Sequence, residues 1–142
     1  MLGRLAKWLR IMGYDTHYQS FYQREDIEPL IHVGRALLSR HKKTTVRYPR
    51  ALLILSDHVE GQLQQIRDGF QLEPDRLRWF TRCLICNVLL KKTRVEHLRL
   101  NVPDYVLYKN PTRIRFCPSC GRHFWPGNHR ERMMRQLENW GF

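Results

Sequence analysis

The segments Cys83-Leu84-Ile85-Cys86 and Cys117-Pro118-Ser119-Cys120-Gly121 carry all four cysteines of this 142-residue chain. Each segment places two thiols three positions apart, a spacing that lets a tight turn present both sulfur atoms to one side. Gly121 permits a turn conformation that other residues resist. Four thiolates are the ligands of a structural, tetrahedral zinc ion. The sequence therefore predicts a Zn²⁺ site formed by Cys83, Cys86, Cys117 and Cys120.

Two disulfides or a redox-active dithiol are the alternative uses of these cysteines. Disulfides would need an oxidising compartment, but the apolar residues of the first turns are interrupted by Arg4, Lys7 and Arg10, so they form no signal segment. A redox dithiol would explain one Cys-x-x-Cys pair and leave the other unexplained. We therefore favour the zinc site and expect a cytoplasmic protein.

The interval of 30 residues between the two pairs exceeds the commonest zinc-knuckle spacing and favours a ribbon with strands inside it. The expected strands are the apolar runs at residues 88–90, 95–100, 106–108 and 114–116. Beyond the ribbon, residues 129–140 show the periodicity of a closing helix, with Met133, Leu137 and Trp140 facing inward.

Helical and strand-like segments alternate before the cysteines. Apolar residues recur at helical spacing over residues 2–12, and Gly13 lies where that helix would end. Residues 25–33 look helical, although Pro29 would be tolerated only in the first turn. The apolar runs 36–39 and 51–55 are typical of buried strands.

A further helix is predicted after the second strand, because Asp57 and Glu60 have the spacing of a capping box and Val59, Leu63 and Ile66 would form its buried stripe. The helix and strand pattern weakens over residues 72–81, where Pro74 marks a boundary. We thus expect an α/β domain with a three-layer parallel sheet in residues 1–76, and a small β zinc ribbon with a closing helix in residues 77–142.

The chain is strongly basic, with 25 Lys and Arg against 13 Asp and Glu, and residues 77–142 alone carry 13 basic and 4 acidic side chains. A basic surface of this size indicates a polyanionic partner, most commonly nucleic acid. A membrane surface is the alternative, which the first helix fits only in part. No apolar run approaches the length of a membrane span. We favour RNA, with rRNA and tRNA as candidates, and no membrane.

Candidate RNA-contacting residues come from the first helix, the basic stretch between the two strands, the ribbon and the last helix. They are Arg4, Lys7, Arg40, His41, Lys42, Lys43, Arg47, Arg50, Arg82, Trp125, His129 and Arg130. Residues 40–50 are expected to form a loop, and it leaves a strand at the carboxyl end, where α/β sheets bind ligands. Trp79, Trp125 or His129 would stack on bases.

Carboxylates that could bind Mg²⁺ or Mn²⁺ are sparse. The catalytic candidates are Asp57, Asp26 and Glu25, because metal-dependent nucleases gather several acidic groups at strand ends. Each also has a structural interpretation as a helix-capping residue.

The sequence resembles the Mut-seven C-terminal RNase domain family, a PIN-like nuclease fold followed by a zinc ribbon. The resemblance begins with Met-Leu-Gly-Arg-Leu-Ala-Lys-Trp-Leu-Arg at residues 1–10 and Gly-Tyr-Asp-Thr at 13–16. It continues in order through residues 36–40, 62–63, 82–87, 102–103, 116–121 and 125–129. This resemblance implies a metal-dependent ribonuclease that would use Mg²⁺ or Mn²⁺ if its centre is complete.

Two acids that the resemblance implies are missing. Family members usually have a strand before the first helix that ends in a metal-binding Asp, and this sequence begins after it. A second acid would follow the segment at 38–40, where His41 stands instead. A neutral imidazole binds transition metals but does not replace a carboxylate for Mg²⁺. We therefore expect an RNA-binding protein with a degenerate or incomplete nuclease centre.

Two other functions are left open, and so is the question of what takes the place of the missing strand. The chain would be an active ribonuclease if an upstream Asp acts with Asp57 and with Glu25 or Asp26, or a structural component of the ribosome if its charge serves only to neutralise rRNA. The absent central strand would leave backbone groups unpaired. We expect it to be supplied by an upstream segment or a partner, with a rearranged sheet as the alternative.

Overall fold

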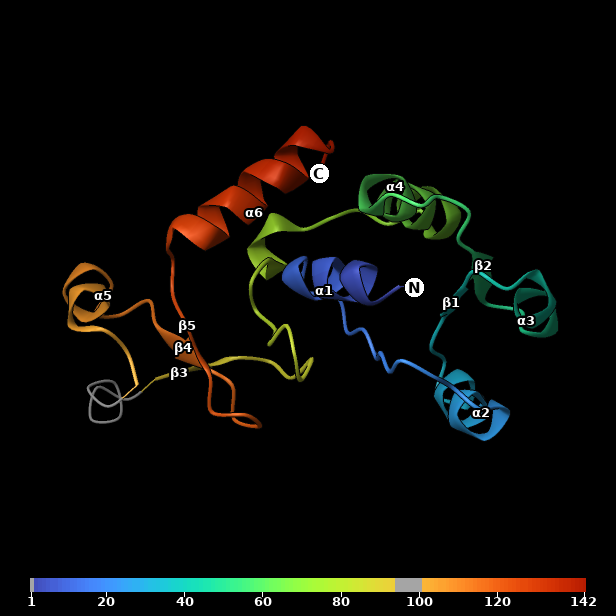
Figure 1. Ribbon diagram of the computed structural model, residues 1–142, viewed down its shortest axis with the longest axis horizontal. Coiled ribbons are helices and arrows are strands. Elements are labelled where there is room, and N and C mark those ends of the chain that lie inside the picture. Colours follow the sequence, from blue (N-terminus) through green and yellow to red (C-terminus); the bar gives the residue numbers. More distant parts are fainter. Residues whose placement is uncertain (1, 94–100) are drawn as a thin grey trace. The chain divides into compact units, whose positions relative to one another are not determined.

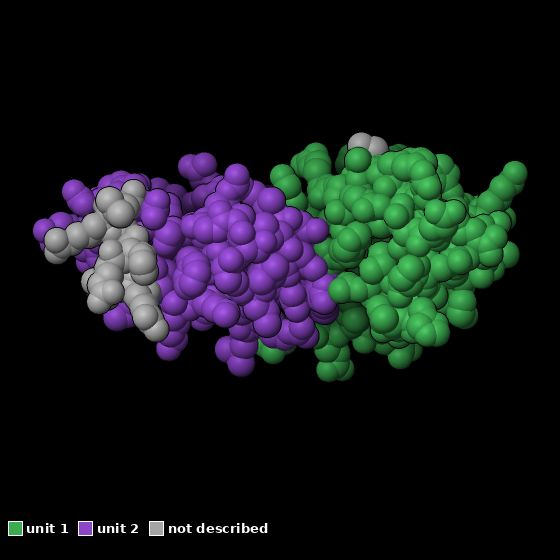
Figure 2. Space-filling model, turned by 90° about the horizontal axis from the view of Figure 1, so that it is seen from below, with its two compact units in different colours: residues 1–9, 16–75 green, residues 10–15, 76–142 purple. Residues whose placement is uncertain are grey.

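The computed structural model describes residues 2–93 and 101–142 (Figure 1). The chain divides into two compact units, which Figure 2 shows in two colours. The first comprises Met1–Leu9 and Thr16–Asp75, and the second comprises Arg10–Asp15 and Arg76–Phe142. The short segment Arg10–Asp15 thus belongs with the cysteine-containing part of the chain.

Helix α1, Gly3–Ile11, is amphipathic, as its sequence predicted. Leu5 and Leu9 are buried, whereas Arg4 and Lys7 on the intervening positions are exposed. Gly13 follows the helix with a φ of +85°, a left-handed conformation that ends the helix and favours glycine. The following residues, 14–19, form neither helix nor strand.

Helix α2, Arg24–His32, begins at a capping box in which Gln23 is the N-cap residue and Asp26 accepts its backbone N–H. Pro29 lies inside this helix and not in its first turn, so the expected position of Pro29 was wrong. Because α2 has no buried residue, water can reach the backbone carbonyl that Pro29 leaves without its helical donor.

Strands β1, Leu37–Ser39, and β2, Ala51–Leu53, pair in parallel with Leu38 opposite Leu52. Helix α3, Lys42–Arg47, connects them, so the expected loop over residues 40–50 contains a helix. The described part of the chain contains no third strand in this sheet. The α/β class and the parallel pair are confirmed, and the larger PIN-like sheet is not.

Helix α4, Val59–Phe70, follows β2 and buries Leu63 and Ile66, as predicted, with Val59 half-buried. It packs closely on β2, because a Cβ atom added at Gly69 would lie 2.9 Å from Cδ1 of Leu52. The predicted capping box was wrong. His58 is the N-cap residue and α4 has no side-chain cap.

The second unit contains the short helix η1, Arg76–Arg78, and an antiparallel sheet in the order β3-β4-β5. Its strands are β3, Lys91–Lys92, β4, Arg115–Phe116, and β5, His123–Phe124. The predicted strand at 114–116 corresponds to β4, whereas the run at 88–90 precedes β3 and only Leu89 forms an isolated bridge, with Arg82. The predicted strand at 95–100 falls outside the described residues, and β5 was not predicted.

The predicted strand at 106–108 was wrong, because these residues lie in helix α5, Asp104–Lys109. Pro103 is the N-cap residue, and Val102 and Val106, four positions apart, form a small core with Ile114. The apolar residues of this segment thus follow a helical period. The closing helix α6, Asn128–Asn139, is confirmed, with Leu137 fully buried and both Met133 and Trp140 half-buried.

Among the described residues, none of the helices combines the length and the apolar character needed to span a bilayer.

Candidate metal centre and carboxylate region

The two Cys-x-x-Cys segments fold into matching turns. In the first, the backbone N–H of Asn87 donates to the carbonyl of Cys83, and in the second that of Gly121 donates to Cys117, each at 2.9 Å. The N–H of Cys83 donates to Val88 and that of Cys117 to Arg122, each at 2.8 Å. The residue after each second cysteine is left-handed, with φ of +64° at Asn87 and +72° at Gly121. These turns are the geometry that the spacing predicted.

The four sulfur atoms of Cys83, Cys86, Cys117 and Cys120 all lie within 4.8 Å of one another, and none forms a disulfide. Cys83 and Cys120 are 3.8 Å apart between their Sγ atoms. A tetrahedron with zinc–sulfur bonds of about 2.3 Å has an edge of about 3.8 Å, so this separation suits a shared ion. The four thiols therefore fit a metal such as zinc.

Burial and hydrogen bonding shift the pKa values of two of the thiols in opposite directions. Burial raises the pKa of Cys83 to about 12, because the interior disfavours its thiolate. The exposed Cys120 has its pKa lowered to about 7, chiefly because the backbone N–H of Arg122 donates to its sulfur. A bound cation would offset the cost of a thiolate at Cys83, which is the role that a structural metal performs in such sites.

The two Cys-x-x-Cys turns, Cys83–Cys86 and Cys117–Cys120, are called the first and second knuckles. Arg10, at the end of α1, supports the first knuckle. Its guanidinium is buried, and Nη1 donates to the carbonyls of Leu84 at 2.8 Å and Ile85 at 3.0 Å. These carbonyls belong to the two residues between Cys83 and Cys86. Sequence reasoning missed this role and treated Arg10 only as a polar interruption of the apolar stripe.

A second set of contacts joins the segment Arg10–Asp15 to the same knuckle. Arg82 donates through Nε to the carbonyl of Gly13 at 3.1 Å and through Nη1 to the carbonyl of Asn87 at 2.7 Å. The Asn87 amide donates to Oδ1 of Asp15 at 2.6 Å. The side chains of Arg82 and Asn87 thus fix the path of the chain on both sides of the cysteine pair.

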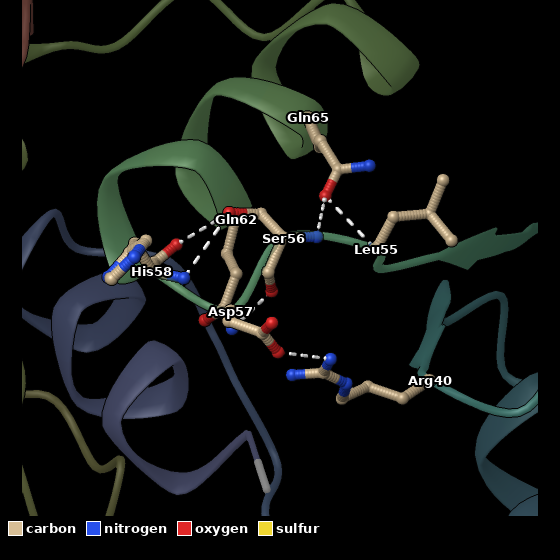
Figure 3. A network of polar contacts seen from close by, with 7 residues as sticks. All are labelled: Arg40, Leu55, Ser56, Asp57, His58, Gln62 and Gln65. Carbon is tan, nitrogen blue, oxygen red and sulfur yellow. Dashed lines mark hydrogen bonds and ion pairs between the residues drawn. The ribbon is translucent and has the colours of Figure 1, made fainter.

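Asp57 lies beyond the carboxyl ends of β1 and β2, in the loop that leads into α4 (Figure 3). The side chain of Asp57 is 80% exposed and forms an ion pair with Arg40, which follows β1. A hydrogen bond from the Arg40 guanidinium, together with its positive charge, lowers the pKa of Asp57. The carboxylate is therefore ionised, and its charge is opposed by a guanidinium.

Two glutamines of α4 fix the backbone of this loop, as Figure 3 shows. The buried Gln62 donates through Nε2 to the carbonyl of Ser56 at 3.0 Å. The side-chain oxygen Oε1 of Gln65 accepts hydrogen bonds from the backbone N–H groups of Leu55 at 3.1 Å and Ser56 at 3.0 Å. Sequence reasoning did not assign a role to either glutamine, because their acceptors and donors are backbone groups.

The structure does not gather the catalytic candidates into a metal site. Among the residues it describes, the four cysteines are the only group of three or more His, Cys, Asp or Glu side chains close enough to share an ion. Asp26 caps α2 through the N–H of Gln23 and Glu25 is exposed on the same helix, whereas Asp57 pairs with Arg40.

Comparison with known proteins identifies the family of this chain. The family model for the Mut7-C RNAse domain matches residues 1–137. The chain belongs to the Mut7-C RNase domain family. Comparisons with curated proteins and with solved structures give no significant match. Membership of an RNase domain family makes the chain nuclease-like and indicates RNA as the substrate class.

Most of the basic residues predicted to contact RNA are exposed in this Mut7-C domain. They are Arg4, Lys7, Arg40, His41, Lys42, Lys43, Arg47 and Arg50, together with His129 at the start of α6. Arg82 is half-buried and donates to backbone carbonyls, which leaves less of it available to a ligand. Arg130 is also half-buried, with its guanidinium 4.6 Å from the centroid of the Phe80 ring, and burial lowers its pKa.

The two tryptophans differ in accessibility. Trp79 is only 5% exposed, so the prediction that it stacks on bases was wrong. Trp125 of the Mut7-C domain is half-buried against Val102, Val106 and Ile114 and keeps part of its surface open.

Proposed function

We propose that this Mut7-C RNase domain protein binds RNA through a basic, zinc-stabilised surface and that its carboxylate centre is incomplete for metal-dependent cleavage. The observation that carries the proposal is the ion pair between Arg40 and Asp57 beyond the carboxyl ends of the parallel strands.

Metal-dependent phosphodiester cleavage requires several oxygen ligands around one or two divalent ions. Here the carboxylate of Asp57 at the strand ends is paired with Arg40. Arg40 is followed in the sequence by His41, Lys42 and Lys43. The three basic residues are exposed, as is His41. This combination of charges attracts phosphate groups and opposes the approach of Mg²⁺ or Mn²⁺.

The charge distribution supports a polyanionic ligand. Residues 1–50 carry 10 basic and 4 acidic side chains, and residues 77–142 carry 13 and 4. Lys and Arg that contact phosphates displace condensed counterions, so the affinity for RNA should fall steeply as salt rises. In this proposal zinc has a structural role, holding the two Cys-x-x-Cys turns together.

The test measures RNA binding and RNA cleavage on the same zinc-loaded protein. Binding should occur without Mg²⁺ and weaken steeply with salt, and cleavage should remain at background when Mg²⁺ or Mn²⁺ is added. Asp57→Asn is compared with Asp68→Asn, a control that removes another exposed carboxylate paired with an arginine. Metal-dependent cleavage that Asp57→Asn abolishes and Asp68→Asn preserves would contradict the proposal and establish an active ribonuclease.

A further inference from the structure

We infer that one face of the sheet β3-β4-β5, together with the hollow beside Trp125, binds unpaired RNA bases by stacking. This inference rests on the proposed RNA binding and names the form of RNA that the second unit recognises. It concerns the ribbon and not the region around Asp57.

The register of the sheet separates its side chains into two faces. In antiparallel pairs, directly opposed residues project to the same side. Lys91 is opposite Phe116, and Phe116 is opposite His123, so these three residues share one face. The rings of Phe116 and His123 have centroids 6.4 Å apart and are tilted by 32°. They form a pair of partly exposed ring surfaces beside the exposed ammonium group of Lys91.

The opposite face of the sheet has a structural role. Lys92, Arg115 and Phe124 oppose one another there. Phe124 packs against the cluster of Cys83, Leu90 and Cys117, so this face contributes to the core around the cysteines. The core around the cysteines therefore does not account for the face that carries Phe116 and His123.

A hollow of about 350 Å³ lies along β5 and the second cysteine turn, and its lining includes Cys120, Gly121 and Phe124. His123 and Trp125 line it from alternate positions of the chain, and Arg122 and Asn101 supply a cation and an amide at its wall. Small-molecule sites in proteins occupy about 300–1,000 Å³, so the hollow can accept a group of the size of a base. Val102, Val106 and Ile114 support the indole of Trp125. An aromatic ring held in this way loses little conformational entropy on binding.

Charge complementarity selects nucleic acid as the occupant. Lys91 lies on the same face as the two rings, the exposed Arg122 immediately precedes β5, and none of the three strands carries an acidic residue. Cations beside aromatic surfaces are the combination that binds single strands, because the phosphates contact the cations while the bases stack on the rings. Bases within a duplex already stack on one another, so a duplex can use only the cations.

The experiment compares single-stranded and duplex RNA. A labelled oligoadenylate and a duplex of equal length are titrated with zinc-loaded protein. Each variant is used only if its zinc content and its circular dichroism spectrum match those of the unmodified protein. His123→Ala and Trp125→Leu should each weaken binding of the single strand by about 5-fold or more and leave the duplex affinity unchanged. If Trp125→Leu fails to fold because of its packing, His123→Ala alone decides this arm.

Lys91→Ala and Lys92→Ala form a matched pair, because the two residues are neighbours, exposed and identical in charge but project to opposite faces. Lys91→Ala should weaken single-strand binding more than Lys92→Ala does. If the two lysine variants are equivalent and His123→Ala has no effect while RNA still binds, the stacking face is refuted and the proposed function stands. If neither RNA binds to the unmodified protein, both proposals fail.

Discussion

Gly121 and Asn87 occupy the same position in the two knuckles, and this equivalence allows a sharp test of the metal centre. Both residues follow the second cysteine of their pair and both are left-handed. Apart from its two chain neighbours, none of the described residues has a heavy atom within 4 Å of a Cβ atom added at Gly121. A substitution there therefore tests backbone conformation without a steric contact. We predict that Gly121→Asn is tolerated better than Gly121→Ala.

The magnitude follows from the backbone conformation. A residue with a Cβ atom pays about 1–2 kcal/mol in the left-handed region, whereas Asn adopts it more readily through local hydrogen bonding. Replacing Gly also restricts the unfolded chain, which stabilises by about 0.4–1 kcal/mol. That contribution is common to both variants and cancels when they are compared. Gly121→Ala should thus be about 1 kcal/mol less stable than Gly121→Asn.

The assay is urea unfolding of the zinc-loaded protein, together with competition for zinc by a chelator. Gly34→Ala is the matched control, since Gly34 has a φ of +88° with open space around its Cβ position but lies in the first unit. It should lower stability without changing the affinity for zinc. The reasoning is refuted if the Ala and Asn variants at Gly121 have the same stability and the same zinc affinity.

Three further predictions concern the support of the knuckles and the metal itself. Arg10→Met should lower stability by about 3 kcal/mol, because two hydrogen bonds from a charged donor are lost, while the exposed Arg4→Met should change it by less than about 0.5 kcal/mol in thermal unfolding. Gly13→Ala should cost more than about 2 kcal/mol in urea unfolding, because it combines a φ of +85° with a Cβ position 2.3 Å from the Arg78 carbonyl oxygen. The contact is contradicted if Gly13→Ala lowers the free energy of unfolding by no more than Gly34→Ala does. Chelation of the metal should make the exposed Cys120 reactive towards a thiol reagent, because the metal no longer holds its sulfur, and unchanged reactivity would contradict a four-thiolate centre.

Local patterns made much of the fold predictable. The spacing of apolar residues in α1, α4 and α6 indicated which helix faces are buried. The short apolar runs before Arg40 and Ser56 predicted β1 and β2. The cysteine spacing was sufficient for the metal centre, because two Cys-x-x-Cys turns can meet at one ion only in a few ways. These features depend on residues close together in the sequence or on one residue type.

Elements whose character depends on distant partners were harder to predict. The segment around Val106 contains β-branched and aromatic residues and so resembled a strand, yet its contact with Val102 and Ile114 favours a helix. Asp57 has the spacing of a capping residue, but Arg40, 17 positions earlier, binds its carboxylate instead. Trp79 looked available for stacking because the burial of its side chain leaves no signature in its neighbours along the chain.

The residues by which this sequence resembles its family hold the chain together, and this separates family membership from catalysis. Five residues of the matching segments make these contacts: the guanidinium groups of two arginines donate to backbone carbonyls, and an asparagine amide donates to an aspartate carboxylate. They are Arg10, Gly13, Asp15, Arg82 and Asn87. None of these contacts requires a catalytic metal. These contacts therefore stabilise the domain whether or not the chain cleaves RNA. Activity in this family has to be argued from the carboxylates themselves, and at the strand ends the described residues place Asp57, which is paired with Arg40.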